Sequence, residues 1–229
     1  GMGHTAENLA KKYSISRERQ EQMALESHQK ASKAIEKGEF KDEIIPVNGI
    51  SEDGCIRPDT TLESMAQLKP AFDKDGVVTA GTSSPLTDGA AAVIVCSEDY
   101  AKANKLKMLA YIRGMAISGC SPEIMGIGPV VSSQKALKRA GLKLEDIDII
   151  EMNEAFAAQS LACVDELGID MSKLNIHGGA LAMGHPLGAS GARITGKAAL
   201  LLQKNGARYA LSTMCVGGGK GCETILERA

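Results

Sequence analysis

Ile147-Asp-Ile-Ile-Glu-Met-Asn-Glu-Ala-Phe-Ala157 runs from a short apolar strand into the first turn of a helix, and this junction decides the fold class. We expect the strand over 147–152. The helix over 155–167 stops at Gly168, because glycine readily adopts the left-handed conformation that ends helices. A strand that leads directly into a helix is the repeating unit of layered α/β domains. The segment therefore predicts an α/β domain.

Strands and helices continue to alternate on both sides of this junction. Sheets built in this way place their sites in the loops that follow strands, so those loops are the first places to look for chemistry. The expected order is a strand over 109–117, a helix over 129–140 ended by Gly141, a brief strand over 174–177, an apolar helix over 190–204, and strands over 209–215 and 221–227.

The first third of the chain is polar, and its pattern is mostly helical. Helices are expected over 5–12 and 16–37, with Ser16 as the cap of the second helix and Gly38 as its stop. Because this third lacks dense apolar runs, we interpret it as a peripheral layer. A short strand is expected over 42–47, and a further short helix is expected to carry Leu62, Met65 and Leu68.

Ala90 to Cys96 is a continuous apolar run of strand length, and Ser97 then begins a helix that ends near Asn104. Apolar residues that do not alternate with polar ones indicate a strand that is covered on both faces. We therefore expect a buried strand here, followed by a short helix.

Composition excludes several classes of function. The net charge of −2 gives no reason to expect a nucleic acid or a membrane surface as partner, and no apolar run is long enough to cross a bilayer. The N-terminus shows no basic segment followed by an apolar run, so no signal peptide is expected. The six cysteines form no C-x-x-C pair and only four histidines are present, so no metal site is expected. The expected state is six reduced thiols in the cytoplasm.

His185 lies in a loop that is dense in glycine, from Gly178 to Gly191, and this loop leads into the apolar helix. Glycine at this density implies sharp turns or close approach to a ligand. The start of a helix disfavours an imidazolium, so His185 would be a neutral base near physiological pH. The alternative is a loop histidine that only hydrogen-bonds to backbone.

Asn153 directly follows the strand expected over 147–152, and Cys215 is the last residue of the strand expected over 209–215. Three glycines come shortly after Cys215, and their N–H groups could bind an oxyanion while the thiol gives or takes a proton. Asn153 could orient a water or polarise a carbonyl group. The alternatives are a buried cysteine before a hairpin turn and an asparagine that caps a helix.

Several segments together resemble the thiolase family. The resemblance implies an acyltransferase that splits a 3-ketoacyl-CoA with CoA, or that runs the reverse Claisen condensation. It implies CoA and acyl-CoA as substrates, with no tightly bound cofactor. The segments are Asn153-Glu-Ala-Phe-Ala157, Gly179-Ala-Leu-Ala-Met-Gly-His-Pro-Leu-Gly-Ala-Ser-Gly-Ala-Arg193, Cys215-Val-Gly-Gly-Gly-Lys-Gly221, Met2-Gly-His-Thr-Ala-Glu-Asn8 and Ile56-Arg-Pro-Asp-Thr-Thr-Leu-Glu-Ser64.

The resemblance covers this whole chain but not a whole thiolase, because the segment with the family's nucleophilic cysteine is not found here. It implies a partial, mostly helical loop domain over 1–85, the closing strand and helix of the N-terminal domain over 86–106, and a complete C-terminal domain over 107–229. The N-terminal half-domain would be largely absent and supplied by another segment or chain. The resemblance also implies a homo-oligomer.

Residue roles are implied by position in the family's motifs. His185 matches the histidine that activates the nucleophilic thiol and helps to hold the thioester oxygen, and Asn153 matches the asparagine that orients a water in the same oxyanion site. Cys215 matches the cysteine that removes or returns the α-proton of acetyl-CoA, and the Gly217 backbone matches part of a second oxyanion hole. The implied CoA and substrate contacts are Arg57, Ser64, Ser84, Met125 and Phe156.

Three other hypotheses remain open. Segments 79–89 and 116–126 look more like degradative thiolases, with the biosynthetic acetoacetyl-CoA thiolase as the alternative. The absent nucleophile also permits a non-catalytic protein that binds CoA or serves in assembly. A third hypothesis gives the nucleophile's role to Cys120 or Cys222, although neither has sequence support for an activating base. Without the nucleophile, the 229-residue chain alone is expected to be inactive.

Overall fold

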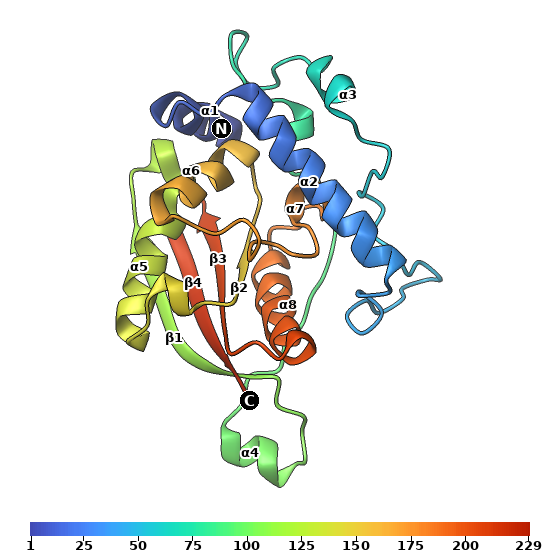
Figure 1. Ribbon diagram of the computed structural model, residues 1–229, viewed down its shortest axis with the longest axis vertical. Helices are drawn as coiled ribbons and strands as arrows, with labels where there is room; N and C mark the ends of the chain where they lie inside the picture. Colours follow the sequence, from blue (N-terminus) through green and yellow to red (C-terminus); the bar gives the residue numbers. More distant parts are fainter.

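Four strands form one mixed sheet in the computed structural model, which describes all 229 residues. The strands lie in the order β1-β4-β3-β2 (Figure 1); β4 pairs antiparallel with β1 and β3, whereas β2 and β3 are parallel. With helices around this sheet, the predicted α/β class is confirmed. The bounds are Ala110–Gly119 for β1, Ile149–Met152 for β2, Tyr209–Val216 for β3 and Lys220–Arg228 for β4.

Helices cover both faces of the sheet. On one face α5 and α6 bury the largest apolar cluster together with β3 and β4, and on the other face α8 buries a second cluster. Gly141 and Gly168 have φ values of 69° and 68°, which confirms both predicted glycine stops. None of the helices combines the length and apolarity that a bilayer crossing requires. The bounds are Gly128–Ala140 for α5, Ala157–Leu167 for α6 and Ser190–Asn205 for α8.

The first third of the chain packs over one end of the sheet (Figure 1), and it is more than a peripheral layer. Leu9, Met23 and Ala24 are buried in the same cluster as Ile150 of β2, so these helices complete the main core. Ser16 caps the second helix as predicted, because its Oγ accepts a hydrogen bond from Arg19 N at 3.2 Å. The bounds are Met2–Lys12 for α1, Arg17–Glu36 for α2, Leu62–Ala66 for α3, Glu98–Ala103 for α4 and Ala180–Met183 for α7; 3₁₀ turns lie at Ala80–Thr82, Pro122–Ile127 and Leu144–Asp146.

Three predicted strands are wrong. Residues 42–47 form a turn and loop in which only Val47 makes a bridge, to Ile50, and the strand expected over 174–177 is reduced to one bridge between Leu174 and β2. The run 90–96 forms no strand at all. A strand needs a neighbouring strand for its backbone hydrogen bonds, and apolar composition does not supply one.

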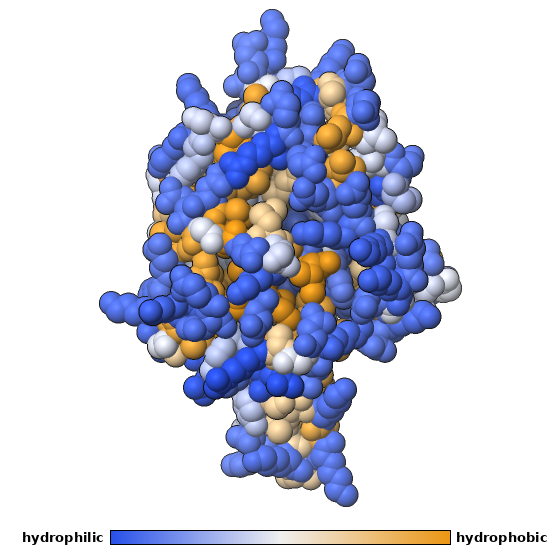
Figure 2. All heavy atoms as spheres, in the orientation of Figure 1, coloured by the Kyte–Doolittle hydropathy of each residue, from blue (hydrophilic) through white to orange (hydrophobic).

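The run 90–96 is therefore exposed instead of buried. Val93, Ile94 and Val95 are 46%, 84% and 71% exposed, which reverses the prediction of a strand covered on both faces. Exposed apolar surface is also visible over the middle of the face that carries β2 and α8, within a mostly hydrophilic surface (Figure 2).

Gly221→Ala is expected to destabilise the fold by about 3 kcal/mol, since overpacking at a site that cannot relax is costly. A Cβ at position 221 would overlap the backbone carbonyl of Gly128, where α5 begins against β4. Urea unfolding of Gly221→Ala measures the effect. Gly54→Ala is the control, because a Cβ there would meet nothing within 4 Å. Equal stability of the two variants would contradict this account of the α5–β4 contact.

Candidate active site

Asn153 and Cys215 lie at the same end of the sheet. The parallel register pairs Met152 of β2 with Thr213 of β3, and Asn153 N donates to Thr213 O at 2.9 Å. Asn153 therefore leaves β2 beside the last residues of β3, where Cys215 sits. Polar groups that follow neighbouring parallel strands meet at the carboxyl end of a sheet, which is where α/β domains bind ligands.

His185 lies in the loop between α7 and α8, and the start of α8 brings this loop to the same end of the sheet. A Cβ built on Gly191, in the first turn of α8, would lie 3.5 Å from Met214 Sδ of β3. The ring of His185 is anchored to this turn, because its Nδ1 lies 2.6 Å from Ser190 Oγ. The structure thus brings Asn153, His185 and Cys215 to one region.

The Ser190 contact defines which nitrogen of His185 is available. Ser190 Oγ donates to Pro186 O at 3.1 Å, and a carbonyl oxygen can only accept. With its proton on Pro186 O, Ser190 Oγ accepts a hydrogen bond from Nδ1–H of His185, and this tautomer leaves Nε2 with a free lone pair. Burial lowers the pKa of His185, and the nearby Arg193 lowers it further. His185 is therefore a neutral imidazole at neutral pH, with the chemistry of a base at Nε2.

The side-chain amide of Asn153 is completely buried and makes no hydrogen bond in the chain through either Oδ1 or Nδ2. Asn153 does not cap α6, whose N-cap residue is Phe156, so the helix-cap alternative is wrong. A buried amide without partners costs free energy, and such groups persist at sites that bind water or ligand. Asn153 has the properties of an amide reserved for a ligand.

Cys215 is buried at the end of β3, where it packs with Met125 and Ala155. Burial raises the pKa of its thiol to about 12; a backbone hydrogen bond opposes this shift, and the neighbouring Cys120 adds to it. Cys215 is consequently a protonated thiol at neutral pH, able to donate a proton. Burial also raises the pKa of Cys120, which is the opposite of what an activated nucleophile requires.

The turn between β3 and β4 carries the three glycines. Gly218 and Gly219 have φ values of 84° and 85°, a conformation that favours glycine. Gly217 is exposed, and its N–H makes no hydrogen bond within the chain. This N–H is therefore available as a donor to an oxygen on a ligand.

The five expected CoA and substrate contacts fall into two groups. Ser84 and Phe156 lie beside the site, because Ser84 N donates to Ala155 O at 3.1 Å and Phe156 packs against the cluster that contains Met125. Arg57 and Ser64 lie elsewhere. Arg57 is exposed on a segment that packs against α2, where its backbone N–H donates to Nδ1 of His28 at 3.1 Å. Ser64 is exposed and caps α3 together with Thr61, as a helix-cap serine would.

Sequence reasoning did not single out three residues that shape the site. Ser190 orients His185, and its only signal in the sequence is its place at the start of an apolar helix. Arg193 lowers the pKa of His185 from the next turn of α8. Glu154 is a buried carboxylate directly after Asn153, with partners that are distant in sequence. No pattern in the sequence around Glu154 indicates those partners.

Glu151 gives the fold a pH dependence. It is 1% exposed on β2, and burial raises its pKa from 4.5 to about 7, although Arg193 and Lys197 oppose the shift. Because the folded pKa lies above the unfolded one, the unfolded chain loses the proton first, and stability falls as pH rises from about 4.5 to about 7. The shift corresponds to a loss of about 3 kcal/mol.

We therefore expect Glu151→Gln to gain about 3 kcal/mol relative to wild type between about pH 4 and about pH 8. Urea unfolding of both proteins at both pH values measures how the difference in their free energies of unfolding changes with pH. Burial also raises the pKa of Glu223, so the wild-type slope should flatten fully only when both carboxyl groups are replaced. The same difference at both pH values would show that Glu151 ionises normally in the fold.

Known proteins provide an independent comparison. The thiolase N-terminal domain family matches residues 1–99, and the thiolase C-terminal domain family matches residues 106–228. The 3-ketoacyl-CoA thiolase of Vibrio parahaemolyticus is 52% identical over 240 residues, an alignment that covers 99% of this chain and 61% of that protein. The 3-ketoacyl-CoA thiolase of Marinobacter nauticus has the same identity and coverage. The chain thus spans about 61% of the length of these curated relatives.

Solved structures agree with the sequence relatives. Human mitochondrial 3-ketoacyl-CoA thiolase superposes with a TM-score of 0.95 at 47% identity, covering 100% of this chain and 60% of that one. The same human protein in complex with CoA also matches with a TM-score of 0.95. The acetyl-CoA acetyltransferase of Bacillus anthracis has a TM-score of 0.95 at 45% identity, with 100% and 60% coverage. With both domain families matched along its length, the chain belongs to the thiolase family.

Proposed function

We propose that this chain contributes the acid–base and oxyanion groups of a 3-ketoacyl-CoA thiolase, which cleaves a 3-ketoacyl-CoA with CoA as in fatty acid β-oxidation. One observation carries the proposal. The buried amide of Asn153 leaves β2 beside the end of β3, which carries the protonated thiol of Cys215. The first turn of α8, which anchors the neutral imidazole of His185, contacts Met214 of β3. Carbon–carbon cleavage next to a thioester requires a base, an acid and oxyanion donors of this kind.

The proposed reaction has two steps. In the first step, a thiolate from outside these 229 residues attacks the 3-keto carbon, and the C2–C3 bond breaks. The electron pair moves to C2, which takes the proton of Cys215, and acetyl-CoA leaves. Gly217 N–H stabilises the enolate oxygen of acetyl-CoA as that charge develops.

In the second step, the thiol of CoA attacks the acyl thioester on the enzyme. His185 Nε2, which takes the nucleophile's proton in the first step, returns it when the nucleophile leaves, and the Cys215 thiolate left by the first step takes the CoA proton. His185 and a water held by Asn153 stabilise the oxyanion at the reacting carbonyl. The released products are an acyl-CoA shortened by two carbons and a regenerated nucleophile.

We place the CoA contacts of this reaction at Arg57, Ser64, Ser84, Met125 and Phe156. Arg57 offers an exposed guanidinium to the nucleotide phosphates, and Phe156 lies edge-on to Phe72 with ring centroids 5.8 Å apart, a surface for the apolar acyl end. The human structural relative in complex with CoA supports CoA as a ligand of this family. No tightly bound cofactor or metal takes part in this scheme.

The division into 1–85, 86–106 and 107–229, the homo-oligomer and the cytoplasmic location stay predictions. Light scattering coupled to size exclusion tests the oligomer. The biosynthetic direction is the second candidate, supported by the 45% identity to an acetyl-CoA acetyltransferase. A preference for acetoacetyl-CoA over longer 3-ketoacyl-CoA substrates would favour it.

A chimera tests the proposed function. The part of the Vibrio parahaemolyticus thiolase that this chain does not cover is joined to the chain, and thiolysis is followed by loss of the 3-ketoacyl-CoA absorbance. We expect thiolysis by the chimera and none by the 229-residue chain. A folded chimera without activity, in an assay where the Vibrio enzyme is active, would overturn the proposal. CoA binding by that inactive chimera, measured by calorimetry, would point to the non-catalytic alternative.

A further inference from the structure

Glu154 is a buried carboxylate whose two oxygens accept hydrogen bonds from three different segments of the chain. Its Oε2 accepts from Ser27 Oγ of α2 at 2.7 Å and from the N–H of Leu181 in α7 at 3.2 Å. Its Oε1 accepts from Asn175 Nδ2 at 2.6 Å. Glu154 follows Asn153 directly, so these bonds act on the segment that carries the buried amide.

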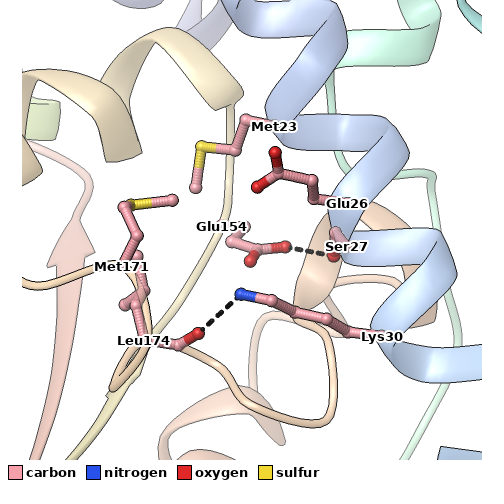
Figure 3. A pocket seen from close by; sticks show the side chains of 7 residues that line it. All are labelled: Met23, Glu26, Ser27, Lys30, Glu154, Met171 and Leu174. Carbon is pink, nitrogen blue, oxygen red and sulfur yellow. Dashed lines mark hydrogen bonds between the residues drawn. The ribbon is translucent and has the colours of Figure 1, made fainter. Parts of the chain in front are cut away.

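No cation pairs with this carboxylate. Lys30 lines the same small cavity, but its Nζ donates to Leu174 O at 3.0 Å (Figure 3). The charge of Glu154 is held by neutral donors alone. A charge-assisted bond is stronger and more directional than a neutral one, so this arrangement specifies a geometry.

The same bonds fix the segment that leads to His185. Gly179 N donates to Ser27 Oγ at 2.9 Å, and a Cβ on Gly179 would overlap the Glu154 carboxylate. The short helix α7 starts immediately after Gly179 and ends at Met183, and Gly184, with φ of 89°, then turns the chain into His185. Between Gly179 and His185 only Gly184 lies outside the short helix α7, so the Glu154 carboxylate is connected to the His185 imidazole by an almost fixed piece of backbone.

Asn175 closes the arrangement at the end of β2. Its Nδ2 also donates to Met152 O and its Oδ1 accepts from Met152 N, each at 2.9 Å. The end of β2, the loop at 175 and the start of α7 are therefore joined around one carboxylate. Glu154 therefore holds both the segment that carries the Asn153 amide and the segment that leads to the His185 imidazole.

We propose that Glu154 is a positioning residue that fixes His185 relative to Asn153; this inference rests on the proposed function for its effect on rate. Glu154 does not need to touch substrate to do so. A glutamine at 154 has the same shape but only one accepting oxygen, so its NH₂ group must face either Asn175 Nδ2 or the two donors at Oε2. In the first orientation the NH₂ group opposes Asn175 Nδ2 at the end of β2, and in the second it opposes the N–H of Leu181 in α7.

The test compares Glu154→Gln and Ser27→Ala in the chimera. Misplacing reacting groups by about 1 Å costs up to about 10²-fold in rate, so we expect kcat to fall about 10- to 100-fold with the KM for CoA unchanged. Ser27→Ala removes the hydroxyl of α2 that accepts from Gly179 N and donates to Glu154 Oε2, and it should cause a smaller fall in kcat. It also keeps the proposal testable if Glu154→Gln does not fold.

The control is Glu21→Gln, a buried carboxylate of α2 whose partner is Arg17 at 2.7 Å, outside the active site. It should lower the melting temperature without changing kcat. A kcat unchanged in Glu154→Gln and Ser27→Ala, or reduced as much in Glu21→Gln, would overturn the positioning role.

A second readout separates this inference from the proposed function. In the 229-residue chain, ring ¹⁵N shifts report the tautomer of His185, with the signals assigned through His185→Gln. We expect Glu154→Gln and Ser27→Ala to move these shifts and Glu21→Gln to leave them in place. If the chimera lacks thiolysis but the shifts move, only the proposed function fails; if the shifts stay, the positioning role fails.

Discussion

His185→Ala in the chimera is expected to lower kcat/KM for thiolysis about 10²- to 10⁴-fold, the range that loss of a general acid or base typically costs. Nδ1 of His185 lies 2.6 Å from Ser190 Oγ, so Nε2 is the nitrogen that acts as the base in the proposed reaction. Burial and Arg193 lower its pKa, so the ring is already neutral at the pH of the assay. Alanine removes the base and leaves the glycine turns of the loop intact. Initial rates at saturating CoA measure the effect.

His177→Ala is the matched control. His177 is another half-buried histidine with a lowered pKa, about 4, and it packs edge-on against Phe40 with ring centroids 6.1 Å apart. We expect its loss to cost stability and to leave the thiolysis rate unchanged. Equal losses in the two variants would mean that His185 supports the fold without acting as the base.

Local rules predicted the parts of the fold that depend on neighbours in sequence. Gly141 and Gly168 end their helices because a left-handed residue is needed there, and Ser16 starts α2 because its hydroxyl reaches Arg19 N. The strand predicted over 90–96 is wrong because it depends on residues that are distant in sequence. Its apolar pattern shows a tendency to form a strand, but a strand exists only where another lies beside it.

The candidate site divides in the same way. The motif residues could be chosen from sequence, because glycine density and strand ends mark them. Their supporting contacts could not, since Ser27 and Glu154 are 127 positions apart and meet only after α2 has packed over the sheet. Asn153 shows that a residue type alone misleads: asparagine is a good helix cap, yet here its amide bonds to nothing in the chain.

Cys215→Ala is expected to slow exchange of the methyl protons of acetyl-CoA with deuterated water about 10²- to 10⁴-fold in the chimera. Exchange isolates the proton transfer assigned to Cys215, and NMR of acetyl-CoA measures it directly. Cys163→Ala is the control: Cys163 is also buried, burial raises its pKa, and its Sγ donates to Gly126 O at 3.3 Å within the core. It should lose stability and keep the exchange rate.

The pH dependence of exchange follows from the state of the Cys215 thiol. Burial holds its pKa at about 12, so the thiol is protonated at neutral pH and is ready to protonate the enolate released by thiolysis. Removing a proton from acetyl-CoA needs the thiolate instead, whose fraction rises about tenfold per pH unit below the pKa. Exchange should therefore accelerate about tenfold per pH unit above neutrality, whereas thiolysis should stay nearly constant. An exchange rate that does not change with pH would show that another group removes this proton.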